Sequence, residues 1–340
     1  MTKSFLSRLL VAGHSAVCVL VAAFAVAGAL GFASPVLDLF NHLQVLWLAI
    51  LVPFGLVVPI IRPPGRLRVL LSTIVFLGAT ASAVVVVPET LAGFGSRPAP
   101  PTDGRPVYRL MTHNLFGRNY DMKRVAAEIL RENPDIVAVQ EYFDEQRHRL
   151  GPLLAKAYPY SLACGGGRRA FVALFSKLPF TTSPDEECVT DGGKSERVAR
   201  IIAQFKGRDG VPFTVVTTHL DWPYPISRQT SEFDTLSGAI AKINGPLILA
   251  GDFNSTSWSY ALRSFASKAN LTRQTRGLVT FPARFFVFGW RDTVPFLPLD
   301  HIMTRGGITV HELHRGAPTG SDHLPVIIDF SVSPQNASSQ

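Results

Sequence analysis

The sequence predicts an α/β domain in which mixed β-sheets are covered by helices, attached to three transmembrane helices. Three long apolar stretches fill the N-terminal part of the 340-residue chain. Beyond them, strand signals and helix signals alternate almost to the C-terminus. Tight turns join some neighbouring strands and helices join others, so we expect mixed sheets and not a purely parallel one.

The N-terminal part, residues 1–92, is expected to be a membrane anchor. Its apolar stretches without Lys, Arg, Asp or Glu are Leu9–Leu37, Asn41–Ile61 and Val69–Pro88. Roughly 20 helical residues cross a hydrocarbon core of about 30 Å, so we expect spans at about 9–33, 42–61 and 69–88. A chain that is 47% hydrophobic and only 17% charged is too apolar for an ordinary soluble enzyme.

Basic residues near the expected spans predict the orientation. They precede the first stretch and lie between the second and third, at Lys3, Arg8, Arg62, Arg66 and Arg68. Because cytoplasmic loops carry the excess of Lys and Arg, we expect an inner-membrane protein with its N-terminus inside and everything after Pro88 extracytoplasmic, in the periplasm. The alternative for the first stretch is a signal peptide cleaved near residues 27–29, which would leave the C-terminal domain outside as well.

The remaining chain divides into a linker, one large domain and a tail. The Pro- and Gly-rich residues 93–106 are expected to form a linker, residues 107–332 the domain, and the polar residues 333–340 a disordered tail. The formal net charge of +8 divides into +4 (7 basic, 3 acidic) for residues 1–105 and +4 (26 basic, 22 acidic) for residues 106–340. That balance is compatible with an anionic substrate but is far from that of a dedicated nucleic-acid-binding protein.

Two cysteines, Cys164 and Cys188, fall in the exported domain, where disulfides persist. We expect them to be bonded to each other, with two free thiols as the alternative. Cys18 lies in the first apolar stretch and is expected to be a small apolar side chain.

The strands and helices of the domain are predicted from the period of its apolar residues. Short apolar or β-branched runs predict strands at Val107–His113, Asp135–Gln140, Phe171–Ser176, Val198–Phe205, Phe213–Thr218, Leu247–Ala250, Ile302–Met303, Ile308–Leu313 and Leu324–Val332. Helical spacing predicts helices at Asp121–Arg131, Phe143–Lys156, Ile226–Ile243 and Ser257–Ala269. The Gly-Arg-Asp-Gly sequence at 207–210 predicts a hairpin turn.

Six polar clusters lie at or near the ends of apolar runs in this domain. They supply carboxylate, carboxamide and imidazole groups at Asn114, Glu141, His219, Asp252 with Asn254, Asp300 with His301, and Ser321-Asp322-His323. Functional side chains gather where buried strands end. One such cluster would be weak evidence, but six together predict a metal-assisted hydrolytic site.

The chemistry of phosphodiester hydrolysis suits these groups. A catalyst has to offset the charge of the phosphate, deprotonate water and stabilise the leaving alkoxide. Glu141 is the strongest candidate for binding a hard divalent cation, Mg²⁺ or Mn²⁺, with Asn114 and Asp322 as further oxygen ligands. Asn114 alone could equally be a turn residue.

Acid–base and phosphate-binding roles fall on the other clusters. His323 is the candidate general base, and Asp300 the carboxylate that orients it. Asp252 and Asn254 are two residues apart, so in extended backbone both would face the same way and could orient water and hold a phosphate oxygen. His219 is expected to contact phosphate or protonate the leaving oxygen. His301 should point away from Asp300 and is expected to be structural.

The order of the motifs N, QE, THL, GDFN, LDH and SDH resembles the endonuclease/exonuclease/phosphatase superfamily, the DNase I-like phosphodiesterases, over residues 107–332. The resemblance implies a four-layer fold, with two mixed sheets face to face and helices outside. It also implies metal binding by Asn114 and Asp322, and water activation by the Asp300–His323 pair. Phe116 departs from the common pattern, in which a polar or acidic residue follows two positions after the Asn.

The natural substrate is left open by the sequence. The aromatic segment Phe281–Phe296 could form an interfacial loop, although aromatic residues are more often buried in the core. We therefore expect a tethered nuclease first, a phospholipid or small-molecule phosphodiesterase or phosphatase second, and an inactive binding module last. The expected partners are the phosphodiester substrate and the lipid bilayer; the sequence predicts no protein partner.

Overall fold

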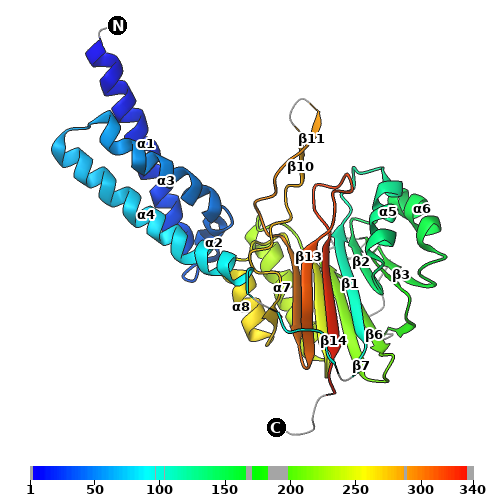
Figure 1. The fold of residues 1–340 in the computed structure, drawn as a ribbon. Helices are drawn as coiled ribbons and strands as arrows, with labels where there is room; N and C mark the ends of the chain where they lie inside the picture. Colours follow the sequence, from blue (N-terminus) through cyan, green and yellow to red (C-terminus); the bar gives the residue numbers. More distant parts are fainter. Residues whose placement is uncertain are drawn as a thin grey trace. The chain divides into compact units, whose positions relative to one another are not determined.

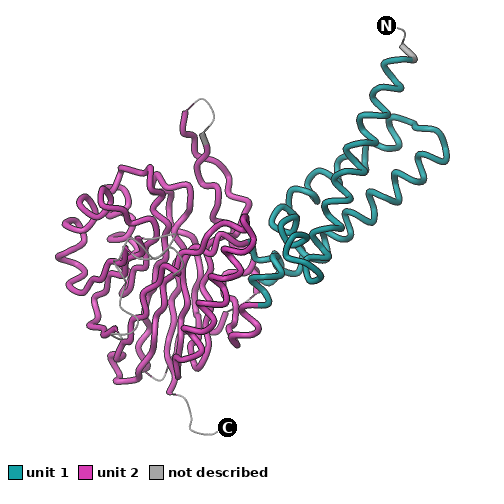
Figure 2. Tube along the Cα trace, turned by 180° about the vertical axis from the view of Figure 1, so that it is seen from behind, with its two compact units in different colours: residues 1–92, 256–264 teal, residues 93–255, 265–340 magenta. Residues whose placement is uncertain are grey.

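The computed structural model describes the chain except residues 1–2, 96, 103, 166–170, 183–197, 287–288 and 335–340. Two compact units are present: residues 1–92 with 256–264, and residues 93–255 with 265–340 (Figure 2).

The first unit contains three long apolar helices and one short helix. These are α1 (Lys3–Ala29), α2 (Pro35–Asn41), α3 (Gln44–Ile61) and α4 (Gly65–Ala92). Phe5–Ala29, Gln44–Ile61 and Gly65–Ala92 are long and apolar enough to cross a membrane. The three helices bury a shared cluster that includes Leu51 and Leu71, while other large apolar side chains such as Ile60 and Phe76 remain exposed. That distribution suits helices that are surrounded by lipid.

The first expected span is shorter than predicted at its C-terminal end. The apolar stretch continues to Leu37, but α1 ends at Ala29 and a new helix begins at Pro35. Ser34 caps α2 by accepting a hydrogen bond from the Val36 backbone N–H, and Pro35 occupies the first helical position, where its missing N–H has no cost.

The second unit contains two six-stranded mixed sheets (Figure 1). The first has the order β13-β14-β1-β2-β4-β3 and the second β5-β6-β7-β8-β12-β9. In each, one central pair is parallel (β1 with β2, β7 with β8) and the other neighbours are antiparallel. The strands of the first sheet are β1 (Val107–Asn114), β2 (Ile136–Gln140), β3 (Tyr160–Cys164), β4 (Val172–Ser176), β13 (Ile308–Arg315) and β14 (Val326–Val332). Those of the second are β5 (Phe180–Thr181), β6 (Ala199–Lys206), β7 (Pro212–His219), β8 (Leu247–Asp252), β9 (Thr272–Arg273) and β12 (Asp300–Arg305).

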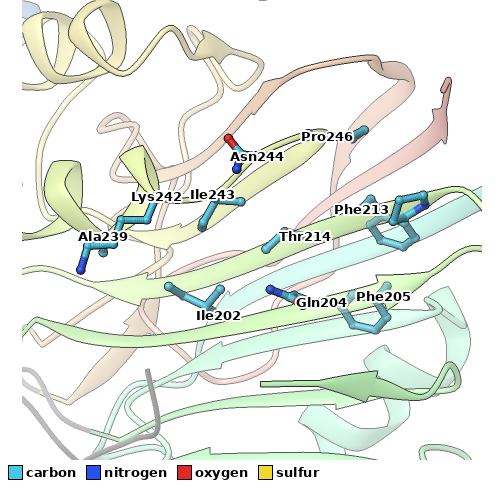
Figure 3. A pocket seen from close by; sticks show the side chains of 12 residues that line it. Ile202, Gln204, Phe205, Phe213, Thr214, Ala239, Lys242, Ile243, Asn244 and Pro246 are labelled. Carbon is cyan, nitrogen blue, oxygen red and sulfur yellow. The ribbon is translucent and has the colours of Figure 1, made fainter. Parts of the chain in front are cut away.

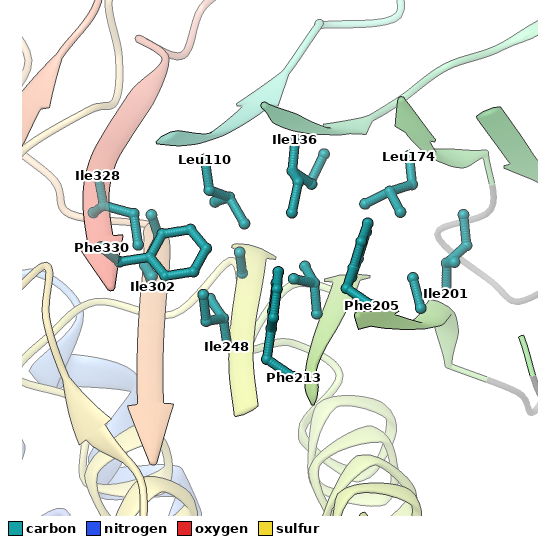
Figure 4. Close-up of a cluster of buried hydrophobic side chains, with 14 of the residues drawn as sticks. Leu110, Ile136, Leu174, Ile201, Phe205, Phe213, Ile248, Ile302, Ile328 and Phe330 are labelled. Atoms are coloured by element: carbon teal, nitrogen blue, oxygen red, sulfur yellow. The ribbon is translucent and has the colours of Figure 1, made fainter. Parts of the chain in front are cut away.

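The two sheets face each other across one apolar core. Alternate residues of each strand enter it, among them Leu110, Ile136, Phe213, Ile248 and Ile328 (Figure 4). The remaining elements are the helices α5 (Met122–Glu132), α6 (Asp144–Leu154), α7 (Ile226–Ala241) and α8 (Tyr260–Lys268), and the separate hairpin β10 (Arg284–Phe286) with β11 (Trp290–Asp292). Helices α5 and α6 cover the outer face of the first sheet and α7 that of the second (Figure 1). The expected four-layer arrangement of two mixed sheets with outer helices is therefore confirmed.

Local signals in the sequence explain most of these elements. Asp121 caps α5 by accepting a hydrogen bond from the Arg124 backbone N–H, and Asn133 ends that helix in a left-handed conformation. The turn at 207–210 joins β6 to β7 as a hairpin. Cys164 is disulfide-bonded, whereas its expected partner Cys188 lies outside the described residues.

Candidate active site

Five strands deliver the predicted site residues to one edge of the two sheets. Side chains alternate along a strand, so residues at even positions of β1, β2, β8 and β12 and at odd positions of β7 point between the sheets. Asp252 ends β8 in register with His219 of β7 on one side and with Asp300 of β12 on the other. Asn114 ends β1 in register with Gln140 of β2. Because these side chains all point between the sheets, residues from five separate motifs form one cluster.

An open cleft of about 590 Å³ lies over this cluster. Five predicted residues line it, and three lie directly behind them: Glu141, Asp252, Asn254, Asp322 and His323 in the lining, and Asn114, His219 and Asp300 behind. The structure therefore brings together all eight residues expected from the sequence.

Glu141 reaches the cleft because its backbone departs from the strand. Gln140 already faces the inter-sheet space, so a continued strand would turn Glu141 outward. Its φ of +57° prevents this. The Glu141 carboxylate instead accepts a hydrogen bond from the Gly117 backbone N–H at 2.6 Å. Left-handed backbone at a non-glycine residue is strained, and such strain is concentrated at functional sites.

Asn114 holds two carboxylates close together. Its amide nitrogen donates to Asp252 at 2.8 Å and to Glu141 at 3.3 Å. Its amide oxygen accepts from the Phe116 backbone N–H at 2.9 Å. The amide nitrogen of Asn114 therefore holds the two carboxylates in place by donating hydrogen bonds. Its amide oxygen already accepts a hydrogen bond from the backbone of the loop that follows β1.

Asp300 and His323 form the expected pair. His323 Nδ1 lies 2.8 Å from Asp300 Oδ2, and the Thr280 hydroxyl donates to the same carboxylate oxygen. The opposite ring nitrogen, Nε2, lies 3.8 Å from Asp252 Oδ2. The ring is therefore held between two buried carboxylates, with Nδ1 on one and Nε2 toward the other.

Asp252 is also approached by His219 and by the loop that follows it. His219 Nε2 lies 3.5 Å from Asp252 Oδ2, and the Asn254 backbone N–H donates to Asp252 Oδ1 at 2.8 Å. Asp252 and Asn254 both line the cleft, as expected, but extended backbone is not what brings them there. The strand ends at Asp252, and Asn254 has a φ of +47° that returns its side chain to the Leu220 carbonyl oxygen at 2.9 Å.

Burial and neighbouring charges shift the pKa values of this cluster strongly. Burial alone would lower the pKa of His323, but the Asp300 and Asp252 carboxylates reverse that effect and raise it to about 10. Burial raises the pKa of Asp252. Burial also raises the pKa of Asp322, to about 6, with a further contribution from the charge of Glu141. At neutral pH the ring of His323 is therefore positively charged.

Comparison with known proteins identifies the family. The model of the Endonuclease/Exonuclease/phosphatase family matches residues 111–323. The chain belongs to this family. Its members are hydrolases of phosphoric esters.

The chain is also similar to curated proteins over part of its length. A UPF0294 protein from Vibrio campbellii is 27% identical over 140 residues, which cover 40% of this chain and 45% of that protein. One from Yersinia pseudotuberculosis is 32% identical over 135 residues, covering 38% and 47%. The chain thus spans about half the length of the curated relatives it matches.

Two solved structures show the same fold. An endonuclease/exonuclease/phosphatase from Beutenbergia cavernae aligns with a TM-score of 0.53 at 21% identity, over 69% of this chain and 74% of that one. A family protein from Bacteroides thetaiotaomicron aligns with a TM-score of 0.52 at 19% identity, over 69% and 98%.

Two different groups of residues could hold the divalent cation on which this family generally depends. Asp252, Asp300 and His323 offer ligand atoms within 4.8 Å of one another. In this group a charged imidazole already lies between two carboxylates, so only one net negative charge is left to attract a cation. Glu141 and Asp322 fit a hard cation better: both line the open cleft, and the charge of one raises the pKa of the other.

Residues that the sequence did not single out complete the site. Thr280 binds Asp300, and the Ser321 hydroxyl donates to the Asn114 carbonyl oxygen at 2.7 Å while accepting from the His323 backbone N–H at 3.1 Å. No motif marks Thr280, because its role depends on a loop approaching β12. Ser321 stands in the SDH motif, where the sequence pointed to the charged Asp322 and His323 and not to the hydroxyl.

Two residues of the motifs, His301 and Gly251, have structural roles and do not line the cleft. His301 faces away from the cleft and lies 2.7 Å from the Ser255 carbonyl oxygen, as expected. Gly251 lies so close to β7 that a Cβ atom there would stand 2.0 Å from the Thr218 carbonyl oxygen. Arg200 of β6 is in register with Thr218, on the strand face opposite to the core residues Ala199 and Ile201.

A second pocket, of about 440 Å³, lies at the other end of β7 (Figure 3). Lys242, Asn244 and Gln204 contribute its polar groups, and Thr214 lies five residues before His219 on the same strand. Among the described residues that line it there is no carboxylate or imidazole, so the family chemistry belongs to the first cleft.

Proposed function

We propose that this protein hydrolyses phosphodiester bonds with the help of a divalent cation, Mg²⁺ or Mn²⁺. One observation carries the proposal: Glu141 and Asp322 line the same open cleft as the buried His323, whose ring is paired with Asp300. Proton transfer by the Asp300–His323 pair alone would not require two further carboxylates at the cleft surface. A substrate phosphate, by contrast, needs its negative charge offset before water can attack.

Glu141 and Asp322 would hold the cation, and Asn114 would keep Glu141 in place. Bound there, the cation would supply Lewis-acid stabilisation of charge on the phosphate. Asn114 was expected as a ligand, but the contacts of its amide favour a positioning role. The donor set consists of oxygen atoms, which suits Mg²⁺ or Mn²⁺ and does not discriminate between them.

Proton transfer falls to Asp252, His323 and His219. The Nε2 atom of His323 lies 3.8 Å from Asp252 Oδ2, so the attacking water would lose its proton to this Asp252–His323 pair. Asp300 keeps the ring oriented through Nδ1. His219, on the opposite side of Asp252, is placed to donate to a phosphate oxygen or to the leaving oxygen.

Nucleic acid and phospholipid are the substrate classes to be compared. The motif set alone favours a nuclease, as the sequence suggested. Localisation is part of the proposal: the basic residues around the apolar helices favour an inner-membrane protein whose second unit is extracytoplasmic.

The test is hydrolysis by the full-length protein in detergent micelles or nanodiscs. Bis(4-nitrophenyl) phosphate, plasmid DNA, RNA and phospholipid vesicles would be assayed in parallel with Mg²⁺, with Mn²⁺ and with EDTA. We expect cation-dependent turnover of at least the small diester, lost in Asp300→Ala. Turnover of none of them, or equal turnover in EDTA, would overturn the proposal.

A further inference from the structure

Two segments that contribute Trp222 and Phe281 to the cleft lining also carry exposed apolar side chains. Tyr224 is 75% exposed, Phe285 55% and Val294 86%, and Trp222, which lines the cleft, is 44% exposed. Phe285 belongs to the β10–β11 hairpin, which extends beyond the ends of the sheet strands (Figure 1). We call these four residues, together with Trp290 of the same hairpin, the apolar rim.

The hairpin is anchored at its base. Trp290 packs edge-on against Phe116 of the cleft lining, with ring centroids 5.1 Å apart. The Arg284 guanidinium lies 6.0 Å from the Trp290 ring centroid and donates to the Gly320 carbonyl oxygen at 3.3 Å. The inward contacts of the hairpin are thus supplied by Trp290 and Arg284, so the exposure of Phe285 and Val294 is not explained by packing within this unit. Exposed apolar clusters of this kind mark interaction surfaces.

The charges around the cleft favour a phospholipid over a nucleic acid as its substrate. A nuclease neutralises several phosphates of the backbone with Lys and Arg. Among the described residues that line the cleft, Arg118 is the single basic side chain other than His323, while four are aromatic. Aromatic side chains with a few flanking arginines are typical of surfaces that enter the interface of a bilayer.

The same chain carries three helices that are long and apolar enough to cross a membrane. A phospholipid substrate would therefore be available at high local concentration without a separate encounter. Nucleic acid gains nothing comparable from such a tether.

We infer that the apolar rim enters a lipid leaflet and that the substrate of the cleft is the phosphodiester of a membrane phospholipid. The inference rests on the proposed phosphodiesterase function and names its substrate class. In the reaction, a water oxygen bonds to phosphorus and one ester P–O bond breaks. The proton released by the water ends on the leaving alkoxide, so the products are one alcohol and one phosphomonoester.

The experiment compares two substrates in one preparation. The full-length protein is reconstituted into vesicles of phosphatidylethanolamine and phosphatidylglycerol with Mg²⁺. Release of phosphomonoester or headgroup alcohol is followed by ³¹P NMR, and hydrolysis of soluble bis(4-nitrophenyl) phosphate is measured alongside. The variants are Phe285→Ser and Val294→Ser, with Leu130→Ser on α5, whose side chain is 45% exposed, as the control that removes an exposed apolar side chain elsewhere.

The ratio of the two activities is the readout. We expect each rim variant to lower lipid hydrolysis about 10-fold, as loss of one buried apolar side chain at an interface implies, while the soluble diester and the Leu130→Ser control change less than about 2-fold. Hydrolysis of the soluble diester without hydrolysis of lipid, or an equal loss on both substrates in the rim variants, would overturn the inference and leave the phosphodiesterase proposal intact. Failure to hydrolyse even the soluble diester would instead remove the proposed function itself.

Discussion

Replacing Asp322 with Asn is expected to stabilise the metal-free protein while it weakens cation binding. The pKa of Asp322 is raised from 3.8 to about 6, first by burial and then by the charge of Glu141. The difference between these two pKa values corresponds to about 3 kcal/mol of folding free energy, an upper bound because the side chain keeps some contact with solvent. The native state binds this proton more tightly than the unfolded chain does. Stability therefore falls as pH rises from about 4 to about 6, and above that window the full cost is present.

The measurement is unfolding of the full-length protein in detergent at pH 7.5, in EDTA and in Mg²⁺. In EDTA, Asp322→Asn should raise the midpoint of thermal unfolding by several degrees, because about 1 kcal/mol is worth about 2–4 °C in a domain of this size. In Mg²⁺, the wild type should gain stability and the variant should gain less. Asp234→Asn on the exposed face of α7 is the matched control, with no expected change in either condition. A less stable variant in EDTA, or an equal response to Mg²⁺, would refute the reasoning.

Four further outcomes follow from the site. His323→Ala should reduce turnover by at least about 10²-fold with the fold retained, and near-normal turnover would exclude it from proton transfer. Glu141→Gln should raise the Mg²⁺ concentration for half-maximal activity, and an unchanged titration would exclude it as a ligand. Gly251→Ala should unfold or disable the domain, since its Cβ would meet the Thr218 carbonyl oxygen at 2.0 Å; normal circular dichroism and activity would show that β7 and β8 can separate. Because the pKa of His323 is raised to about 10, its stabilising effect should be complete below about pH 6.5 and lost as pH rises through 10. A wild type and a His323→Gln variant that lose stability in parallel between pH 7 and 10.5 would contradict that assignment.

Most of the regular structure could be predicted from the sequence because it depends on local patterns. The apolar period placed the four helices and the central strands of both sheets close to their observed positions. Two-residue edge strands such as β5 and β9 were not predicted, since their stability comes from one neighbouring strand and not from their own composition. The end of the first span was placed too late for a related reason: hydropathy continues beyond Ala29, where α1 ends, and Ser34 then caps the start of α2.

The sequence was sufficient to predict which residues form the site, but not which hydrogen bonds and ion pairs they make. Strand ends are visible as polar residues after apolar runs, so the clusters were found without knowing the pairing of strands. The left-handed backbone of Glu141 and Asn254 has no mark in the sequence, and it decides where both side chains point. The donor role of Asn114 and the pKa of His323 depend on carboxylates that other strands bring close, such as Asp252 for both, so they follow only from the packed structure.

The register of the strands therefore determines which side chains meet in the site. Asp252 faces His219 and Asp300 because β8 pairs with β7 and β12 in one register. A slip of one residue would turn Asp252 to the outer face and bury Gly251 in its place. The apolar core side chains of β8, Ile248 and Ala250, resist that slip because it would expose them as well. Burial of the core thus stabilises the arrangement in which three charged groups share one buried site. Taking these groups out of water has a desolvation cost that their mutual attraction alone could not offset.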